Sequence, residues 1–118
     1  MNAITQLAQQ PTVRAAMADY RAGLDDVLAQ IIGLQQVPAP PFPEERRADY
    51  MEAQFRVLGV SEVGRDGLNN VYARLPGYGV GRPPLVISAH LDTVFPEDTD
   101  LTTRREGPLL FGPGIGDN

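Results

Sequence analysis

The chain has 118 residues, of which 42% are hydrophobic and 21% are charged, and these are ordinary values for one globular domain. Ten Lys and Arg residues stand against 15 Asp and Glu residues, and the net charge of −5 argues against nucleic-acid binding, which needs clustered cations. The absence of cysteine excludes disulfides and thiolate metal sites. Because there is no signal-like N-terminus and no apolar run near the roughly 18 residues of a membrane helix, we expect a soluble cytoplasmic protein with no membrane contact.

Residues 1–36 form the first predicted segment, which is helical. Apolar residues recur at spacings of three and four and therefore share one helix face. They are Val13, Met17, Tyr20, Leu24, Val27 or Leu28, and Ile31. Gly23 weakens the middle of the segment and is a point where the helix can divide in two. The repeat is short and lacks the flanking charge pairs of a coiled coil, so we interpret this face as core-facing.

Residues 37–43 are rich in proline and predict an extended loop. A second helix is expected to begin near Pro43 and to stop at Gly59, because Pro suits a first helical turn and Gly suits a C-terminal stop. Its predicted buried stripe consists of Ala48, Met51, Phe55 and Leu58. Arg46 and Arg47 form the one basic cluster of the chain, and we interpret this pair as a solvated helix face.

The period of the pattern then changes from helix to strand. Short strands are predicted at 60–63, 70–75 and 109–111, with a turn at 64–67. Residues 85–89 are apolar without a polar face, which predicts a strand covered on both sides. The expected fold is α/β, with helices first and then a mixed sheet. Such a sheet needs helices on both faces and the predicted helices cover only one, so the domain looks unfinished.

His90 and Asp92 follow directly after the apolar strand, where ligands gather in open α/β sheets. Their spacing of two places both side chains on one side of an extended chain. A carboxylate beside an imidazole can accept its N–H and orient the ring for a metal. The alternative is a histidine with a purely structural hydrogen bond. A hydrolytic triad is disfavoured, since there is no cysteine and no Gly-x-Ser-x-Gly elbow.

Residues 112–118 form a glycine-rich loop that contains Asp117. Glycine lets the backbone approach a ligand closely, and a carboxylate at the end of such a loop can hold a metal. Taken alone, Asp117 is better interpreted as a plain helix N-cap. The loop is not a phosphate loop, because the Lys-Ser/Thr pair that would follow is missing.

The two segments 85–96 and 112–118 together resemble the two-zinc exopeptidases and deacylases, a family that includes aminoacylase, carboxypeptidase G, peptidase T and succinyl-diaminopimelate desuccinylase. The resemblance rests on a His-x-Asp-Thr-Val run followed by Gly-x-Gly-Asp-Asn. Residues 37–42 and 69–71 match the lead-in, so the similarity extends from about Leu28 to the last residue.

The resemblance implies a three-layer α/β/α catalytic domain, of which 37–118 is the first part, behind the helical segment 1–36. It implies that His90 ligates zinc, that Asp92 orients it in a catalytic supporting role, and that Asp117 bridges two metals. The peptide bond after this aspartate is often cis in the family. The implied cofactor is a pair of zinc ions, with cobalt or manganese as alternatives. The implied substrates are peptides or N-acyl-amino acids, and a homodimer is implied only for a full-length protein.

The family's glutamate pair, which contains the general base, and its remaining ligands and second domain would all follow Asn118. We therefore expect an inactive N-terminal fragment of a metal-dependent hydrolase. Glu97, Asp98 and Asp100 are interpreted as solvated rather than as substitute ligands. Two other hypotheses stay open, namely a binding module without chemistry and a structural domain whose His and Asp satisfy each other.

Overall fold

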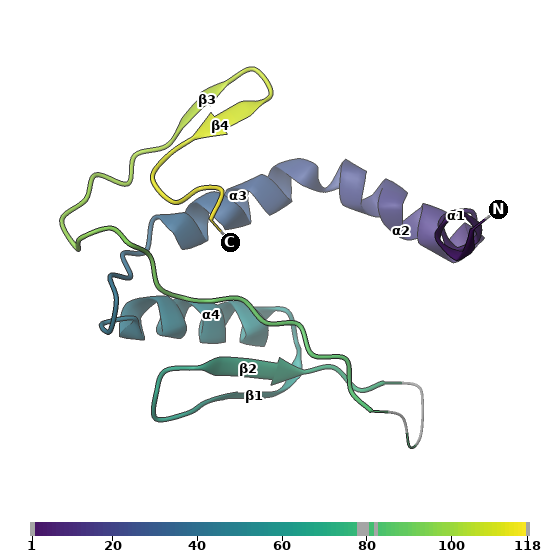
Figure 1. Cartoon of the computed structure of the whole chain (residues 1–118), viewed down its shortest axis with the longest axis horizontal. Helices are drawn as coiled ribbons and strands as arrows, with labels where there is room; N and C mark the ends of the chain where they lie inside the picture. The colour runs from purple at the N-terminus through teal and green to yellow at the C-terminus, as the bar shows by residue number, and fades with distance from the viewer. Residues whose placement is uncertain (1, 78–80, 82, 118) are drawn as a thin grey trace. The chain divides into compact units, whose positions relative to one another are not determined.

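The computed structural model describes residues 2–77, 81 and 83–117 (Figure 1). The chain divides into two compact units, Met1–Ile31 and Ile32–Asn118, and each is described by itself. The candidate site lies in the second unit.

The first unit is helical, as predicted, but it is broken in two places. Helix α1 (Ala3–Ala8) begins at Asn2, whose side chain accepts a hydrogen bond from the Thr5 N–H at 2.9 Å. Helix α2 (Pro11–Ala22) carries Pro11 in its first turn, where a missing N–H does no harm. Gly23 ends α2 and separates it from α3 (Leu24–Gln35), so the predicted division at Gly23 is confirmed.

The apolar face of these helices is not covered by the described residues. Exposed fractions are 51% for Met17, 54% for Tyr20, 44% for Leu24 and 40% for Ile31. The interpretation of this face as core-facing is therefore wrong for these side chains. The periodicity identified the helix and its apolar stripe, but it carries no information about what packs on the stripe.

Helix α4 (Glu45–Val57) follows the proline-rich loop, and Gly59 ends it with a positive φ of 68°. This is the left-handed conformation that makes glycine common just after a helix. Of the predicted stripe, Ala48 is fully buried, while Met51 and Phe55 are half-buried. Leu58 is 68% exposed, because it lies beyond the last turn of the helix, and its predicted burial is wrong.

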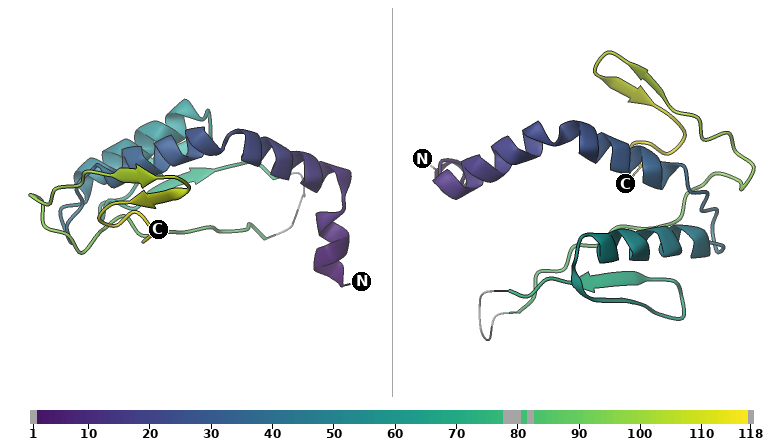
Figure 2. Two further views of the ribbon diagram at one scale, coloured as in Figure 1. Left: turned by 90° about the horizontal axis from the view of Figure 1, so that it is seen from above. Right: turned by 180° about the vertical axis from the view of Figure 1, so that it is seen from behind.

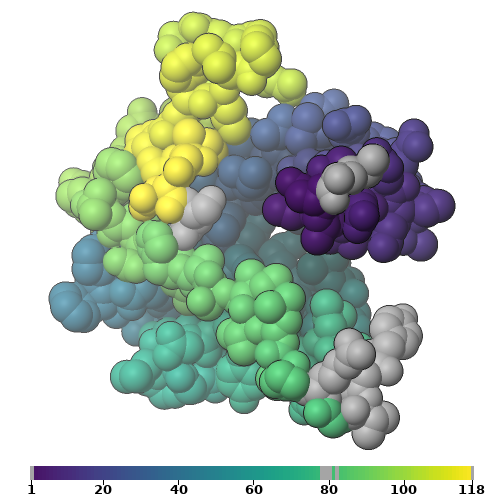
Figure 3. Space-filling view, turned by 45° about the vertical axis from the view of Figure 1, so that its right-hand side comes forward, coloured from purple at the N-terminus to yellow at the C-terminus, as the bar shows by residue number. Residues whose placement is uncertain are grey.

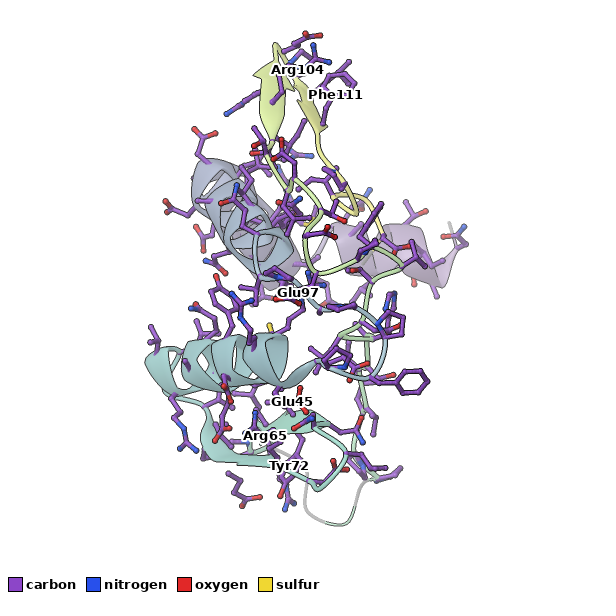
Figure 4. All side chains as sticks on the ribbon, turned by 90° about the vertical axis from the view of Figure 1, so that its left-hand side faces the viewer. Glu45, Arg65, Tyr72, Glu97, Arg104 and Phe111 are labelled. Carbon is purple, nitrogen blue, oxygen red and sulfur yellow. The ribbon has the colours of Figure 1, made fainter. Side chains whose placement is uncertain are left out.

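Strands β1 (Ser61–Arg65) and β2 (Val71–Arg74) pair antiparallel and pack against α4. The strands predicted here are confirmed, although β1 continues through half of the predicted turn. Arg65 lies between the hairpin and α4 and pairs with Asp49 of the helix at 2.6 Å (Figure 4). Sheet and helix are therefore joined by an ion pair as well as by close packing.

A second antiparallel hairpin contains β3 (Arg104–Glu106) and β4 (Leu109–Phe111), joined through Gly107 at φ 57°. The strand at 109–111 is confirmed, but β3 was missed because its residues are all charged. Charged residues pair readily here because the hairpin is exposed. Arg104 covers the Phe111 ring, with 4.9 Å from the guanidinium carbon to the ring centre (Figure 4).

Residues 85–89 do not form the predicted doubly covered strand. The segment is extended and pairs with no described strand (Figures 1 and 2). Leu85, Val86 and Ile87 are 88%, 78% and 89% exposed. A strand needs neighbours to satisfy its backbone and cover its faces, and the described residues provide none. The described chain thus combines helices with small antiparallel sheets, in agreement with the α/β class. None of its helices is long and apolar enough to span a membrane.

Candidate functional site

His90 and Asp92 contact each other at the end of the exposed apolar segment. The imidazole Nδ1 lies 2.9 Å from the backbone oxygen of Asp92 and 3.2 Å from its Oδ1. Both oxygens are acceptors, so this geometry favours the tautomer that carries the proton on Nδ1. The lone pair of the neutral ring is then on Nε2. About half of each side chain is exposed, so both groups are accessible to a ligand.

The backbone of the glycine-rich loop approaches the same imidazole. Hydrogen bonding to the backbone of Asp92 is the main cause that raises the pKa of His90, and hydrogen bonding to the backbone of Asp117 adds to it. Residues 27 positions apart in sequence therefore meet at one ring. In the space-filling view, the yellow C-terminal loop lies against the green segment that precedes it (Figure 3).

The glycine-rich loop turns tightly before it reaches Asp117. The Asp117 N–H donates to the Gly114 carbonyl at 3.3 Å, and Gly114 has a positive φ of 70°. A β-carbon on Gly114 would also stand 3.3 Å from the Phe95 ring, so both the conformation and the space favour glycine here. The Asp117–Asn118 bond lies outside the described residues, and so does its expected cis form.

A pocket of about 350 Å³ opens between this loop and the segment that follows His90. Its lining is mostly apolar side chains and glycine backbone, with one carboxylate. The lining residues are Val94, Phe95, Gly112, Gly114, Ile115, Gly116 and Asp117. The carboxylate of Asp117 is thus available at the edge of an apolar hollow.

Arg47 is a residue that the sequence interpretation misplaced. It is only 3% exposed, whereas a solvated helix face was expected. Its Nε and Nη2 donate to the Val37 carbonyl at 3.0 and 2.6 Å, and its Nη1 donates to the Leu91 carbonyl at 3.0 Å. Burial lowers the pKa of Arg47, and the charge of Asp92 opposes this effect. Arg47 therefore contacts the backbone between His90 and Asp92.

A signal for this burial exists in the sequence. Arg47 lies four and eight positions before Met51 and Phe55, so it shares their helix face. Its neighbour Arg46 is solvated, as expected, and pairs with Glu97 at 2.5 Å. Two adjacent arginines thus point to different sides of α4, and only the helical register separates them.

The other acidic residues near the site are exposed. Glu97 pairs with Arg46, and Asp100 accepts hydrogen bonds from the N–H and hydroxyl of Thr102 at 2.9 and 2.6 Å. Asp98 is also solvent-exposed. Within residues 2–77, 81 and 83–117, no group of three or more His, Asp or Glu side chains could hold a metal ion.

The donor set fits zinc in kind but not in number. One imidazole nitrogen and one carboxylate are ligands that suit zinc. A catalytic zinc normally takes three protein ligands, and His90 and Asp117 supply two for a pair of ions. Asp92 completes the arrangement as the partner of the ring.

No protein-family model matches the chain, and the search of curated proteins finds no match either.

Proposed function

We propose that this chain is the first part of a metal-dependent hydrolase that cleaves peptide or N-acyl amide bonds with two zinc ions. The observation that carries the proposal is the meeting at one imidazole of two segments, His90–Asp92 and the loop ending in Asp117. These segments are the ones that resemble the two-zinc exopeptidases and deacylases. A structural domain would not require a glycine-rich loop to bring the backbone of Asp117 to the only histidine of the sequence.

We further propose that residues 37–118 belong to a three-layer α/β/α domain. The apolar run at 85–87 supports this, because three consecutive exposed aliphatic side chains are unfavourable unless other parts of a protein cover them. In this arrangement His90 would follow an inner strand, at the edge of the sheet where ligands bind.

His90, Asp92 and Asp117 would each have a separate role. The Asp92 carboxylate holds the Nδ1 proton of His90, fixes the ring and leaves Nε2 free as a ligand. Asp117 has two oxygens and can offer one to each of two ions. Bound zinc would activate a water molecule near neutral pH and polarise the amide carbonyl. The pocket beside Asp117 would exclude water from an apolar part of the substrate.

Zinc titration of the chain tests the proposal, with the imidazole of His90 observed by NMR. The chain has one histidine, so its side-chain nitrogen signals need no assignment. Zinc is expected to shift the Nε2 signal, and calcium is expected to leave it unchanged, since calcium prefers oxygen ligands. Asp92→Asn should weaken zinc binding by about 10- to 100-fold, the usual effect of losing the partner of a ligating histidine.

Asp98→Asn is the matched control, because it removes one exposed carboxylate six residues further along, and it should leave zinc binding unchanged. The absence of any zinc-dependent shift at His90 would refute the proposal. With only two ligands supplied by its described residues, this chain should hydrolyse no amide at a measurable rate. Steady amidase activity that His90→Ala abolishes would show that the chain needs no further metal ligands for hydrolysis.

A further inference from the structure

Both neighbours of Asp92 are tied to the proline-rich loop or to α4. On one side, the Leu91 carbonyl accepts a hydrogen bond from Arg47. On the other, the Thr93 N–H donates to the Ala39 carbonyl at 2.7 Å, and the Thr93 hydroxyl donates to the same oxygen at 3.3 Å. Thr93 is 9% exposed and Ala39 is 1% exposed, so these bonds are shielded from water. The backbone around Asp92 is therefore fixed, while its carboxylate stays accessible.

The glycine-rich loop is anchored separately, by Gln35 at the end of α3. Its Nε2 donates to the Pro113 carbonyl at 2.9 Å and to the Leu101 carbonyl at 3.1 Å. Gln35 is 6% exposed, and a β-carbon on Gly112 would stand 3.5 Å from Nε2. The loop thus passes close over the amide four residues before Asp117.

Arg47 links the two anchors. Its Nη2 lies 3.5 Å from the backbone oxygen of Gln35, while Nη1 holds Leu91. A guanidinium offers five donors in a fixed plane, which lets one side chain reach backbone groups in several directions. Val37, just after α3, is held by two of these donors. The end of α3 and the segment carrying His90 are therefore fixed to the same turn of α4.

We infer that Arg47 is a positioning residue, which sets the placement of His90 relative to Asp117 through its bonds to Leu91 and to the α3 end that carries Gln35. The expected effect of Arg47 on metal binding rests on the proposed function. The placement of His90 relative to Asp117 does not rest on it, because this placement is a property of the metal-free chain.

The test compares Arg47→Met with Arg46→Met in the 118-residue chain. Both variants lose one positive charge from the same helical turn, but Arg46 is solvated and forms only a surface ion pair. The first measurement is made without metal, at about pH 9, where histidine is neutral. It records the nitrogen shifts that report the His90 tautomer, and the nuclear Overhauser contact between the His90 ring and the Asp117 backbone.

Arg47→Met is expected to lose the contact to Asp117 and to move the tautomer signals toward those of a free peptide spanning residues 88–94. Arg46→Met should keep both. Arg47→Lys, which retains the charge but not the planar set of donors, should lie between them. If Arg47→Met keeps the tautomer and the contact as Arg46→Met does, the inference is overturned.

If Arg47→Met fails to fold, the amide signals of β1 and β2 will be lost. In that case Gln35→Met is used instead. This variant removes only the anchor of the glycine-rich loop. It should lose the contact between His90 and Asp117 and keep the tautomer that the bond to Asp92 favours. Retention of the contact in Gln35→Met would overturn the inference.

Zinc titration of the same variants separates the two proposals. If the wild-type chain binds zinc, Arg47→Met should weaken binding by about 10- to 100-fold and Arg46→Met should not. Equal zinc affinity in both variants would overturn the inference while the proposed function stands. If the wild-type chain shows no zinc-dependent shift, the proposed function fails, and the metal-free measurement alone decides the role of Arg47.

Discussion

At the residue scale, Asp66 organises the turn between β1 and β2. Its carboxylate accepts hydrogen bonds from the Leu68 N–H at 2.8 Å, the Asn70 N–H at 3.0 Å and the Asn70 side-chain amide at 2.9 Å. The bond from the Asn70 side chain is the main cause that lowers the pKa of Asp66, and the two backbone bonds add to it. Such bonds favour the ionised form, so the folded hairpin binds a proton less readily than the unfolded chain does.

This difference predicts an acid-sensitive hairpin. A group whose folded-state pKa is lowered contributes stability that is fully present above its unfolded value, 3.8 for Asp66, and is lost as the pH falls through the folded value. Asp66→Asn should remove this part of the pH dependence. The measurement is amide exchange of β1 and β2 across the acid range, with Asp98→Asn as the control for an exposed carboxylate. Identical acid profiles for wild type and Asp66→Asn would contradict the expectation.

The same scale shows how much of the candidate site the sequence could predict. The contact of His90 with Asp92 follows from a spacing of two and is local. The approach of Asp117 to the ring was implied only by the family resemblance, because no local rule joins residues so far apart. The burial of Arg47 was missed because a pair of arginines ordinarily favours solvent. Here the backbone carbonyls that receive it come from segments well separated in sequence.

At the scale of elements, the side chain of Tyr50 in α4 reaches α3 at Gly33. A β-carbon on Gly33 would stand 2.6 Å from the Tyr50 hydroxyl oxygen and 3.6 Å from the ring carbon that bears it. The first distance is a clash and the second is ordinary contact. The hydroxyl, rather than the ring, would therefore have to shift if residue 33 carried a β-carbon.

A double-mutant cycle tests this packing. Ala is better than Gly in a helix by about 1 kcal/mol, whereas overpacking costs about 1–3 kcal/mol. Gly33→Ala should therefore leave the wild-type chain unchanged or less stable, but should stabilise Tyr50→Phe by about 1 kcal/mol. Denaturant unfolding of the four chains gives the coupling energy. Gly67→Ala, which meets no neighbouring atom, is the control and should be additive with Tyr50→Phe. Additivity of Gly33→Ala would rule out the contact.

Helices and strands differed in how far the sequence could predict them. The helix ends at Gly23 and Gly59 were predicted because their signals lie within the helix and its flanks. The prediction of a strand at 85–89 was wrong because an apolar run indicates only a preference for burial. Whether it becomes a strand depends on partners elsewhere, and the described residues contain none for it. The opposite error occurred at β3, a charged strand that was not predicted because its pairing with β4, and not its own composition, makes it a strand.

At the scale of the whole molecule, burial is low for the size of the chain. Among the described residues, the hydrophobic side chains that are buried are Ala39 and Ala48 alone. Hydrogen bonds from side chains to backbone carbonyls, such as those of Arg47 and Gln35, are consequently important for holding the second unit together.

Exposed apolar surface of this extent predicts self-association of the isolated chain. The segment 85–87 is the strongest candidate, since it is extended, aliphatic and uncharged, as in segments that pair edge to edge. Val86→Lys should reduce association without loss of folding, because Val86 is 78% exposed and contributes little burial. Sedimentation velocity over a concentration series measures the effect.

The control is Gln10→Lys, which makes the same charge change outside the segment. Gln10 is the N-cap of α2, and its side chain makes no capping bond. Because charge alone would act equally in both variants, equal association of the two would assign the effect to net charge and contradict a role for 85–87.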